Sequence, residues 1–510
     1  MILRPTVKVY KRFPLFVWLL IVLVPLATLI PYVVLYYQTP PGLEFTGFIF
    51  ASDDPDSYLA NMKIAETGWK FNFMFTSEET EGGYIFLFYI FLGKLALLLN
   101  TSLIFMYHLA RVVSGMLLIL AGWLFLRTLN LSENERKWGF IIFCLAIQFP
   151  AFCHHYWGLV VHHPEASPFA NILLLPHVTL SQALFLFGLY LFRTFLRSQK
   201  LVYIALINIA VLIMVLIHPY MILPFTLIAL VSYYFQQHSF SYKKIFMAAA
   251  SMVACTPYLA YLFLLMSHPD IRQWQIQSST LFSSPIEPIM FNSILMILGI
   301  MGFFLMYRRD GWRNELLWLC TLSFVLIFIP FYFQERLLEA VGPVLSFAGG
   351  ITISSLETIY QKKKHLVSLI FSFFLIPAIV ALLAPTFNPP TRSFMSKAEV
   401  SMYKWMDRNL HQSDVVLADL PYGLRIPGRA GCRVWCGHHD QTFKKEDKHR
   451  ITRNFFTETK FNRKEFLQNT NVKYILLDTK RSSLPPMKCL IPVRRYGHLL
   501  LFERSPISKL

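Results

Sequence analysis

The chain is dominated by long apolar runs that are separated by short polar segments. Each run is about twenty residues long, the length that a helix needs to cross the hydrocarbon core of a bilayer. We find about eleven such runs over residues 1–384, beginning with one from Phe13 to Tyr37. The stretch from Tyr84 to Leu99 is shorter and is interrupted by Gly93 and Lys94, so we expect a helix that lies in the membrane interface. The pattern predicts a polytopic α-helical membrane domain.

The basic residues give this domain an orientation. Basic clusters follow alternate spans, as at Lys362–Lys364, whereas the segment between Lys137 and Arg193 contains no Lys or Arg. Because cytoplasmic loops are enriched in Lys and Arg, we expect the N-terminus on the cytoplasmic side of the membrane. We expect this membrane to be a bacterial inner (plasma) membrane. The first run is too long for a signal peptide and lacks a cleavage site, so we expect it to remain as a helix. An odd number of spans then places residues 385–510 on the periplasmic or extracellular side.

From residue 385 onward, short segments of helical and strand pattern alternate. This alternation over about 125 residues is typical of a small α/β domain. Helices are expected at 396–410, 444–456 and 463–468, and strands at 415–419, 433–436, 472–478 and 498–503. The domain contains no glycine-rich phosphate loop and no nucleophile elbow. We expect the basic stretch from Gly423 to His439 to be structural or to face an acceptor.

Composition excludes two classes of protein. Of the 510 residues, 55% are hydrophobic and 15% are charged, and the mean hydropathy is +0.48, which excludes a soluble protein. A net charge of +18 is typical of nucleic-acid binding in soluble chains. Here, however, much of the Lys and Arg lies in short loops between spans, where it sets topology and meets anionic lipid. We therefore expect membrane lipids, and not nucleic acid, as partners.

The seven cysteines indicate no zinc site, because none stands at a spacing typical of one. Three fall in predicted spans and are expected to be packing residues: Cys144, Cys255 and Cys320. Three fall in the C-terminal domain, where export would allow one disulfide and one free thiol: Cys432, Cys436 and Cys489.

An acidic turn follows the first predicted span: Ser52-Asp53-Asp54-Pro55-Asp56-Ser57-Tyr58. A carboxylate costs about 2.5–3.5 kcal/mol in hydrocarbon, so Asp53, Asp54 and Asp56 must lie at the membrane surface. Pro55 restricts the backbone between them, so the carboxylates project from a defined turn. One alternative is structural, with Asp53 capping a helix that begins near Ser57. Three clustered carboxylates favour a functional site.

Further polar residues are predicted on the same outer side. His162, His163 and Glu165 stand close together, where they could ligate a divalent metal or hydrogen-bond a sugar. If a metal is bound, Mg²⁺ or Mn²⁺ is expected, with ligands from Asp54, Asp56, Glu165 and His163. His218, just before Pro219, is either a helix-end residue or a substrate ligand.

Arg336 is the candidate for a phosphate-binding cation, because a guanidinium binds phosphate through two parallel hydrogen bonds. The alternative is a snorkelling arginine at a span end that pairs with Glu335 or Glu339. His108 and Arg111 lie one helical turn apart near the start of a span, and we expect them to be interfacial anchors.

These groups gather at the mouth of a hydrophobic bundle, which suits a reaction on a lipid-linked substrate. The lipid tail would stay in the bilayer while its headgroup reaches the interface. A carboxylate that accepts the proton of an attacking acceptor contributes about 10²- to 10⁴-fold in rate. A cation stabilises the departing phosphate.

The run Asp53-Asp54-Pro55-Asp56-Ser57-Tyr58, on a long first external loop at 38–102, resembles the first-loop acidic motif of the GT-C superfamily of membrane glycosyltransferases. This superfamily includes the protein mannosyltransferases and the oligosaccharyltransferase catalytic subunit, whose Asp-Pro pair is similar. Glu165 stands where that subunit has its second-loop acidic motif. The run from Ile426 to Thr442 resembles a stretch of bacterial membrane glycosyltransferases. The organisation matches over nearly the whole chain, but only short motifs match, and a Trp-Trp-Asp motif for protein sequons is absent.

The resemblance implies transfer of a sugar from a polyprenyl-phosphate or polyprenyl-diphosphate carrier to a glycan, lipid or protein acceptor, with inversion at the anomeric carbon. It makes Asp54 or Asp53 the base, Glu165 its assistant, and Arg336 the group that faces the carrier phosphate. The residues alone indicate a lipid-linked headgroup, and the sugar comes from the resemblance.

Two other functions compete with a transferase. A transporter or flippase would place polar residues near the bilayer midplane and often shows inverted repeats. Here few charges lie within the spans, and the candidate residues gather on one side. A non-catalytic scaffold that displays the C-terminal domain would leave the acidic turn unexplained.

Overall fold

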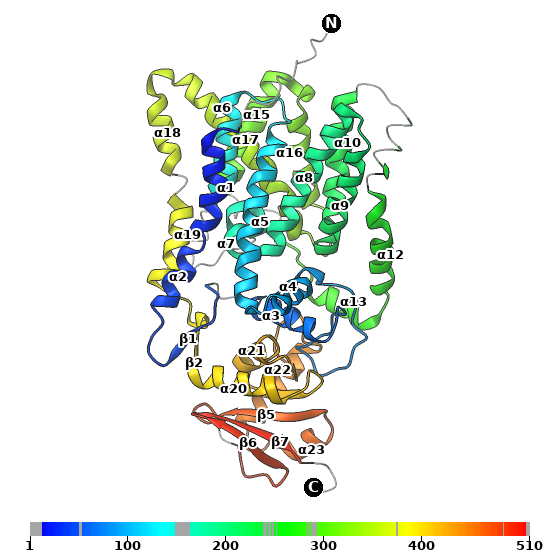
Figure 1. The fold of residues 1–510 in the computed structure, drawn as a ribbon, viewed down its shortest axis with the longest axis vertical. Coiled ribbons are helices and arrows are strands. Elements are labelled where there is room, and N and C mark those ends of the chain that lie inside the picture. The colour runs from blue at the N-terminus through cyan, green and yellow to red at the C-terminus, as the bar shows by residue number, and fades with distance from the viewer. Residues whose placement is uncertain are drawn as a thin grey trace.

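The computed structural model describes residues 13–49, 54–147, 164–237, 252–282, 293–373, 376–482 and 484–505, together with 242, 246, 249–250, 284 and 287. Figure 1 shows a bundle of long helices, a layer of short helices at one end of it, and a C-terminal region that closes with a sheet.

The bundle is built mainly from apolar helices, and the first predicted run, Phe13 to Tyr37, is divided into two of them. The helices are α1 (Leu15–Ala27), α2 (Ile30–Tyr37), α5 (Leu103–Leu126), α6 (Glu133–Leu145), α7 (Pro168–Leu174), α8 (Pro176–Ser198), α9 (Val202–Ile217), α10 (Ile222–Gln237), α12 (Thr256–Leu265), α15 (Ser293–Asp310), α16 (Glu315–Ile327), α17 (Leu338–Ile359), α18 (Lys364–Phe373) and α19 (Ile376–Phe387). Ser102 caps α5, and Ser132 forms a capping box with Glu135 at the start of α6.

Five helices in the described part of the chain are long and apolar enough to cross a membrane. They are Leu15–Tyr37, Leu103–Leu126, Pro176–Ser198, Pro219–Gln236 and Glu335–Ile359. The chain is therefore an integral membrane protein. All five coincide with predicted spans, whereas the total of about eleven stays a prediction.

Helix α17 lies at the centre of the bundle. Every residue from Leu338 to Ser354 is buried, and α17 packs against α6, α15 and α16. A helix that is apolar on all sides and buried on all sides is typical of the core of a large membrane domain. It starts two residues after Arg336, so the bundle core fixes the position of the turn that carries this residue.

Arg111 lies inside the bundle, so the prediction of an interfacial anchor is wrong for this residue. Its guanidinium is fully buried and donates to Thr28 Oγ1 at 2.7 Å and to the carbonyl oxygens of Ile172 and Leu173 at 3.0 and 3.1 Å. It also stands 4.4 Å from the centre of the Tyr32 ring. These oxygens satisfy the buried donors, and Arg111 thereby ties the break between α1 and α2 to α7.

A layer of short elements lies between the bundle and the C-terminal region (Figure 1). It contains α3 (Asp54–Lys63), α4 (Leu87–Leu98) and α13 (Pro269–Gln277). Helix α4 has 12 residues, too few to cross a bilayer. Its length agrees with the interfacial helix expected there.

The C-terminal region folds around a five-stranded sheet of order β4-β3-β5-β7-β6. Strand β3 runs parallel to β4 and β5, and β7 runs antiparallel to β5 and β6. The strands are β3 (Val415–Ala418), β4 (Arg433–Val434), β5 (Val472–Asp478), β6 (Leu490–Tyr496) and β7 (Leu499–Arg504), and the helices are α20 (Lys397–Asn409), α21 (Leu420–Ala430), α22 (Lys445–Thr457) and α23 (Arg463–Gln468). Each predicted element is present, and the sequence pattern missed α21 and β6.

The loop at 38–102 and the C-terminal region are packed as one unit. Strand β1 (Leu43–Phe45) pairs with β2 (Phe394–Ser396), and α21 packs on α3. Lys63 Nζ donates to Asp407 Oδ1 at 2.6 Å. Buried apolar residues of both parts, such as Ile64 and Val416, belong to one hydrophobic core.

The described cysteines are all free thiols: Cys144, Cys255, Cys320, Cys432, Cys436 and Cys489. The disulfide that export would allow is therefore not formed in this structure. Cys436 Sγ instead lies 3.1 Å from Thr452 Oγ1, and burial raises the pKa of the Cys436 thiol to about 11. Its thiol therefore stays protonated at neutral pH.

Candidate active site

Asp54, Pro55 and Asp56 of the acidic turn lie in the first described turn of α3. The sequence predicted a start near Ser57, but a proline at the first helical positions loses no intrahelical hydrogen bond and already has the required backbone angle. The Asp54 side chain is about half exposed (48%). Asp53 lies outside the described residues, so its predicted roles as base or cap stay predictions.

Asp56 faces the C-terminal region. Its carboxylate is largely buried, and Oδ1 lies 3.8 Å from Arg429 Nε. Arg429 also donates to the carbonyl oxygen of Thr46 at 2.8 Å. Asp56 therefore helps to hold α3 on α21, and its predicted part in the chemistry stays a prediction.

Tyr58, one turn beyond Asp54, begins a chain of stacked rings. Its ring stacks on Tyr89 of α4, with the centroids 4.5 Å apart and the planes 11° apart. The Tyr89 hydroxyl lies 2.6 Å from Nδ1 of His177 at the start of α8. The His177 ring in turn lies 5.1 Å from the His218 ring. Tyr58, Tyr89, His177 and His218 thus form a continuous series of contacts from the first described turn of α3 to the end of α9.

Glu165 and Arg336 come together at the end of the bundle. Glu165 lies in the short turn η3 (Pro164–Ala166), and Arg336 lies in η7 (Glu335–Leu337). The two turns are in contact, and η3 also packs on α17. There, the carbonyl oxygen of Ala166 comes so close to Gly342 that a Cβ atom on this glycine would stand 2.1 Å from it.

Asp54, Glu165 and Arg336 all act on Tyr58. Burial raises the pKa of the Tyr58 phenol well above its ordinary value. The negative charges of Asp54 and Glu165 raise this pKa further, and the positive charge of Arg336 lowers it. Because such effects fall with distance and are screened by solvent, the three charges lie in the same region of the molecule as Tyr58. Three residues predicted from separate segments therefore share one region of the fold.

A buried polar network supports this cluster. The carboxylate of Glu339 is fully buried; it accepts a hydrogen bond from the Tyr220 hydroxyl, and its Oε1 lies 2.8 Å from His218 Nδ1. Gln182 Nε2 donates to the Glu339 carbonyl oxygen at 2.7 Å. His218, predicted as a helix-end residue or a substrate ligand, therefore bonds to Glu339. Glu339 in turn bonds to His218 and Tyr220 and not to Arg336, its expected partner in the snorkelling alternative.

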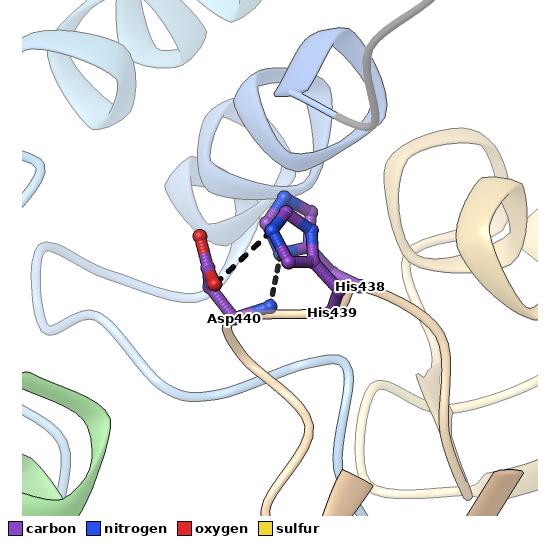
Figure 2. Close-up of side chains that lie close together, drawn as sticks. All are labelled: His438, His439 and Asp440. Atoms are coloured by element: carbon purple, nitrogen blue, oxygen red, sulfur yellow. Dashed lines mark hydrogen bonds and ion pairs between the residues drawn. The ribbon is translucent and has the colours of Figure 1, made fainter. Parts of the chain in front are cut away.

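His438 reaches this site from the C-terminal region (Figure 2). The residue is almost fully buried, with 3% exposed. Its Nδ1 accepts a hydrogen bond from the backbone N–H of Asp440 at 3.1 Å, and its Nε2 lies 3.7 Å from Asp54 Oδ1. The ring packs between Phe75 and His439. Sequence analysis placed His438 only in a basic stretch.

Of the four metal ligands expected from the sequence, His163 lies outside the described residues, as does His162. The three that are described, Asp54, Asp56 and Glu165, do not form a group close enough to hold a metal ion, and Asp56 lies against Arg429. The ligand-type atoms of His438, His439 and Asp440 lie within 4.8 Å of one another. However, His438 Nδ1 already accepts from the Asp440 backbone and His439 Nε2 lies 3.2 Å from Asp440 Oδ1. A divalent metal therefore stays a prediction, and we assign it no step.

Several site residues escaped sequence analysis because nothing local distinguishes them. Tyr58, Tyr89 and His177 have the composition expected of span ends, where aromatic residues are common. Glu339 carried a usable signal, because an ionisable residue inside an apolar run is a functional candidate by default. The sequence alone predicts Glu339 only as a possible partner of Arg336.

Comparison with solved structures identifies the fold. The Archaeoglobus fulgidus oligosaccharyltransferase matches 92% of this chain and 70% of its own, with a TM-score of 0.56 and 12% identity. Arabinofuranosyltransferase AftD from Mycobacteria matches 98% of this chain, with a TM-score of 0.56 and 12% identity, and this chain spans 40% of AftD. ArnT from Cupriavidus metallidurans bound to undecaprenyl phosphate matches 96% of this chain and 98% of its own, with a TM-score of 0.54 and 11% identity.

No family model and no curated protein sequence matches the chain. The likeness is therefore one of fold, and at 11–12% identity it does not extend to activity. The three solved proteins are GT-C glycosyltransferases. The GT-C resemblance expected from the first-loop motif is thus confirmed as a fold.

Proposed function

We propose that this protein is a membrane glycosyltransferase that transfers a sugar from a polyprenyl-phosphate or polyprenyl-diphosphate carrier to an acceptor on the extracytoplasmic side. One observation carries the proposal: Asp54 lies one helical turn from Tyr58, the turns that carry Glu165 and Arg336 are in contact, and the charges of all three residues reach the Tyr58 phenol. Two carboxylates and one guanidinium at a membrane interface are the groups that this transfer needs. The GT-C fold and the undecaprenyl phosphate bound to ArnT support it further.

In the proposed step, the acceptor oxygen forms a bond to the anomeric carbon while the bond from this carbon to the phosphate oxygen breaks. Asp54 takes the proton of the acceptor hydroxyl as general base. The carrier phosphate leaves with the bonding electron pair, and the bond forms on the opposite face of the sugar, so the configuration inverts.

Arg336 supplies the positive charge toward the departing phosphate. Its positive charge lowers the pKa of the Tyr58 phenol, one helical turn from Asp54, so it lies within electrostatic reach of the proposed base. A guanidinium binds phosphate through two parallel hydrogen bonds. Glu165 would orient the acceptor or share its proton, because its charge acts on the same phenol as that of Asp54.

The test uses the full chain in proteoliposomes with a panel of radiolabelled sugars on undecaprenyl phosphate. Wild type should release label from at least one carrier to membrane-derived acceptors. Asp54→Asn keeps the shape of the side chain but removes the base, so we expect about a 10²- to 10⁴-fold loss of turnover. Binding of undecaprenyl phosphate, measured by native mass spectrometry, should be unchanged. Full turnover by Asp54→Asn would sink the proposed role of this carboxylate.

A further inference from the structure

The loop that carries His438 is rigid and is anchored on the loop at 38–102. The Thr442 hydroxyl donates to the Phe75 carbonyl oxygen at 2.8 Å and accepts from the Gly437 N–H at 3.1 Å. The backbones at Gly437 and Gly423 touch so closely that a Cβ atom on Gly437 would stand 2.5 Å from the Gly423 carbonyl oxygen. The His438 side chain is therefore held in one place by both parts of the molecule.

The hydrogen bond at Nδ1 fixes the tautomer of His438. A backbone N–H can only donate, so Nδ1 must be the acceptor nitrogen of a neutral imidazole. The ring proton then resides on Nε2. Figure 2 shows the bond from the Asp440 backbone to the His438 ring that imposes this choice.

The Nε2–H of His438 is a buried donor without a hydrogen-bond partner in the described part of the chain. Burying such a donor is unfavourable unless a partner is reached. The Asp54 carboxylate is the acceptor that faces it, at 3.7 Å. This distance is slightly too long for a hydrogen bond, and catalytic hydrogen bonds often shorten only when substrate binds.

We infer that His438 is a positioning residue that donates its Nε2–H to Asp54 Oδ1 in the working enzyme. The bond would fix the orientation of the carboxylate that accepts the proton of the acceptor hydroxyl. This inference rests on the proposed function, in which Asp54 is the base. It makes the C-terminal region a contributor to the site and not only its neighbour.

The first experiment compares three substitutions of His438 in the full chain in proteoliposomes. His438→Gln places an amide N–H near the position of Nε2, whereas His438→Asn places it nearer Nδ1. We expect His438→Asn and His438→Phe to lower kcat about tenfold or more, with the KM for the labelled carrier unchanged, because a hydrogen bond to a charged group is lost. His438→Gln should recover most of the turnover. His411→Phe, on an exposed histidine before β3, is the matched control.

A second experiment does not depend on sugar transfer. Thermal unfolding of the detergent-solubilised full chain is measured for Asp54→Asn, His438→Phe and the double variant. If the two side chains interact, the effects of the single substitutions on the melting temperature will not add in the double variant. Because the bond is inferred for the working enzyme, the cycle is measured with undecaprenyl phosphate added; additive effects there, or equal turnover by His438→Gln and His438→Phe, would overturn the inference. Absence of transfer by wild type would refute the proposed function, while the unfolding cycle would still decide the contact.

Discussion

The substitution Gly428→Ala tests whether α21 holds the acidic turn in place. A Cβ atom at position 428 would stand 2.6 Å from the Asp56 carbonyl oxygen and 3.0 Å from Leu59 Cβ. Since optimal contacts between carbon atoms are about 3.5–4.0 Å, α21 and α3 would have to separate by several tenths of an ångström or more. Overpacking of this kind costs about 1–3 kcal/mol. A misplacement of about 1 Å at a catalytic group can cost about 100-fold in rate.

Two measurements check this prediction. Thermal unfolding of the detergent-solubilised protein should show a melting temperature lowered by roughly 2 °C or more. Release of the labelled sugar from its undecaprenyl phosphate carrier in proteoliposomes should fall about 10- to 100-fold, because Asp54 is part of the displaced helix. Gly68→Ala is the control, since the nearest atom to its added Cβ would be 4.0 Å away. A Gly428→Ala protein with an unchanged melting temperature and unchanged sugar release would show that the contact between α21 and α3 does not position α3.

Three further predictions concern Gly342, Arg336 and Glu78. Gly342→Ala places a Cβ atom 2.1 Å from the Ala166 carbonyl oxygen, in the turn that carries Glu165. We expect kcat to fall about tenfold, measured by steady-state kinetics. Binding of undecaprenyl phosphate, measured by native mass spectrometry, should be unchanged. Arg336→Gln keeps much of the side-chain length but removes the charge and should weaken that binding about tenfold in the same titration; equal affinity would exclude the phosphate role. Burial raises the pKa of Glu78, but hydrogen bonds, first that from Lys448, outweigh it and lower the pKa below 4.5. The stability that Glu78 contributes is therefore full above pH 4.5 and lost as pH falls through the lowered pKa, so Glu78→Gln should reduce the drop in melting temperature between about pH 6 and about pH 3.

The elements that sequence analysis found are those with a strong local period. Strand β5 was predicted as Val472–Asp478, the bounds that it has in the structure, because a continuous apolar run between polar ends is typical of a buried strand. Helix α21 was missed because its sequence contains Pro421, Gly423, Pro427 and Gly428, which locally indicate a turn. Asp419 caps it and α3 packs on it. The helix therefore depends on a tertiary contact that no local pattern records.

The same distinction separates the parts of the site. Asp54, Glu165 and Arg336 could be identified from the sequence, because an ionisable side chain next to an apolar run carries a free-energy cost and therefore indicates a function. That their charges act on one tyrosine could not be predicted, since they are more than a hundred residues apart from one another along the chain. His438 escaped because its importance lies in one backbone N–H and one distant carboxylate, neither of which its own segment reveals.

The position of Asp54 depends on contacts outside its own helix. Helix α3 has 10 residues, and isolated helices shorter than about 12–15 residues are marginal in water. It is held on two sides by glycines that allow close backbone contact. A Cβ atom at Gly93 of α4 would stand 2.1 Å from the Met62 carbonyl oxygen, and one at Gly428 of α21 would stand 2.6 Å from that of Asp56. The first contact comes from the interfacial layer and the second from the C-terminal region, so the acidic turn is placed by both. A change in either part therefore reaches the proposed base through the backbone of α3, without touching its carboxylate.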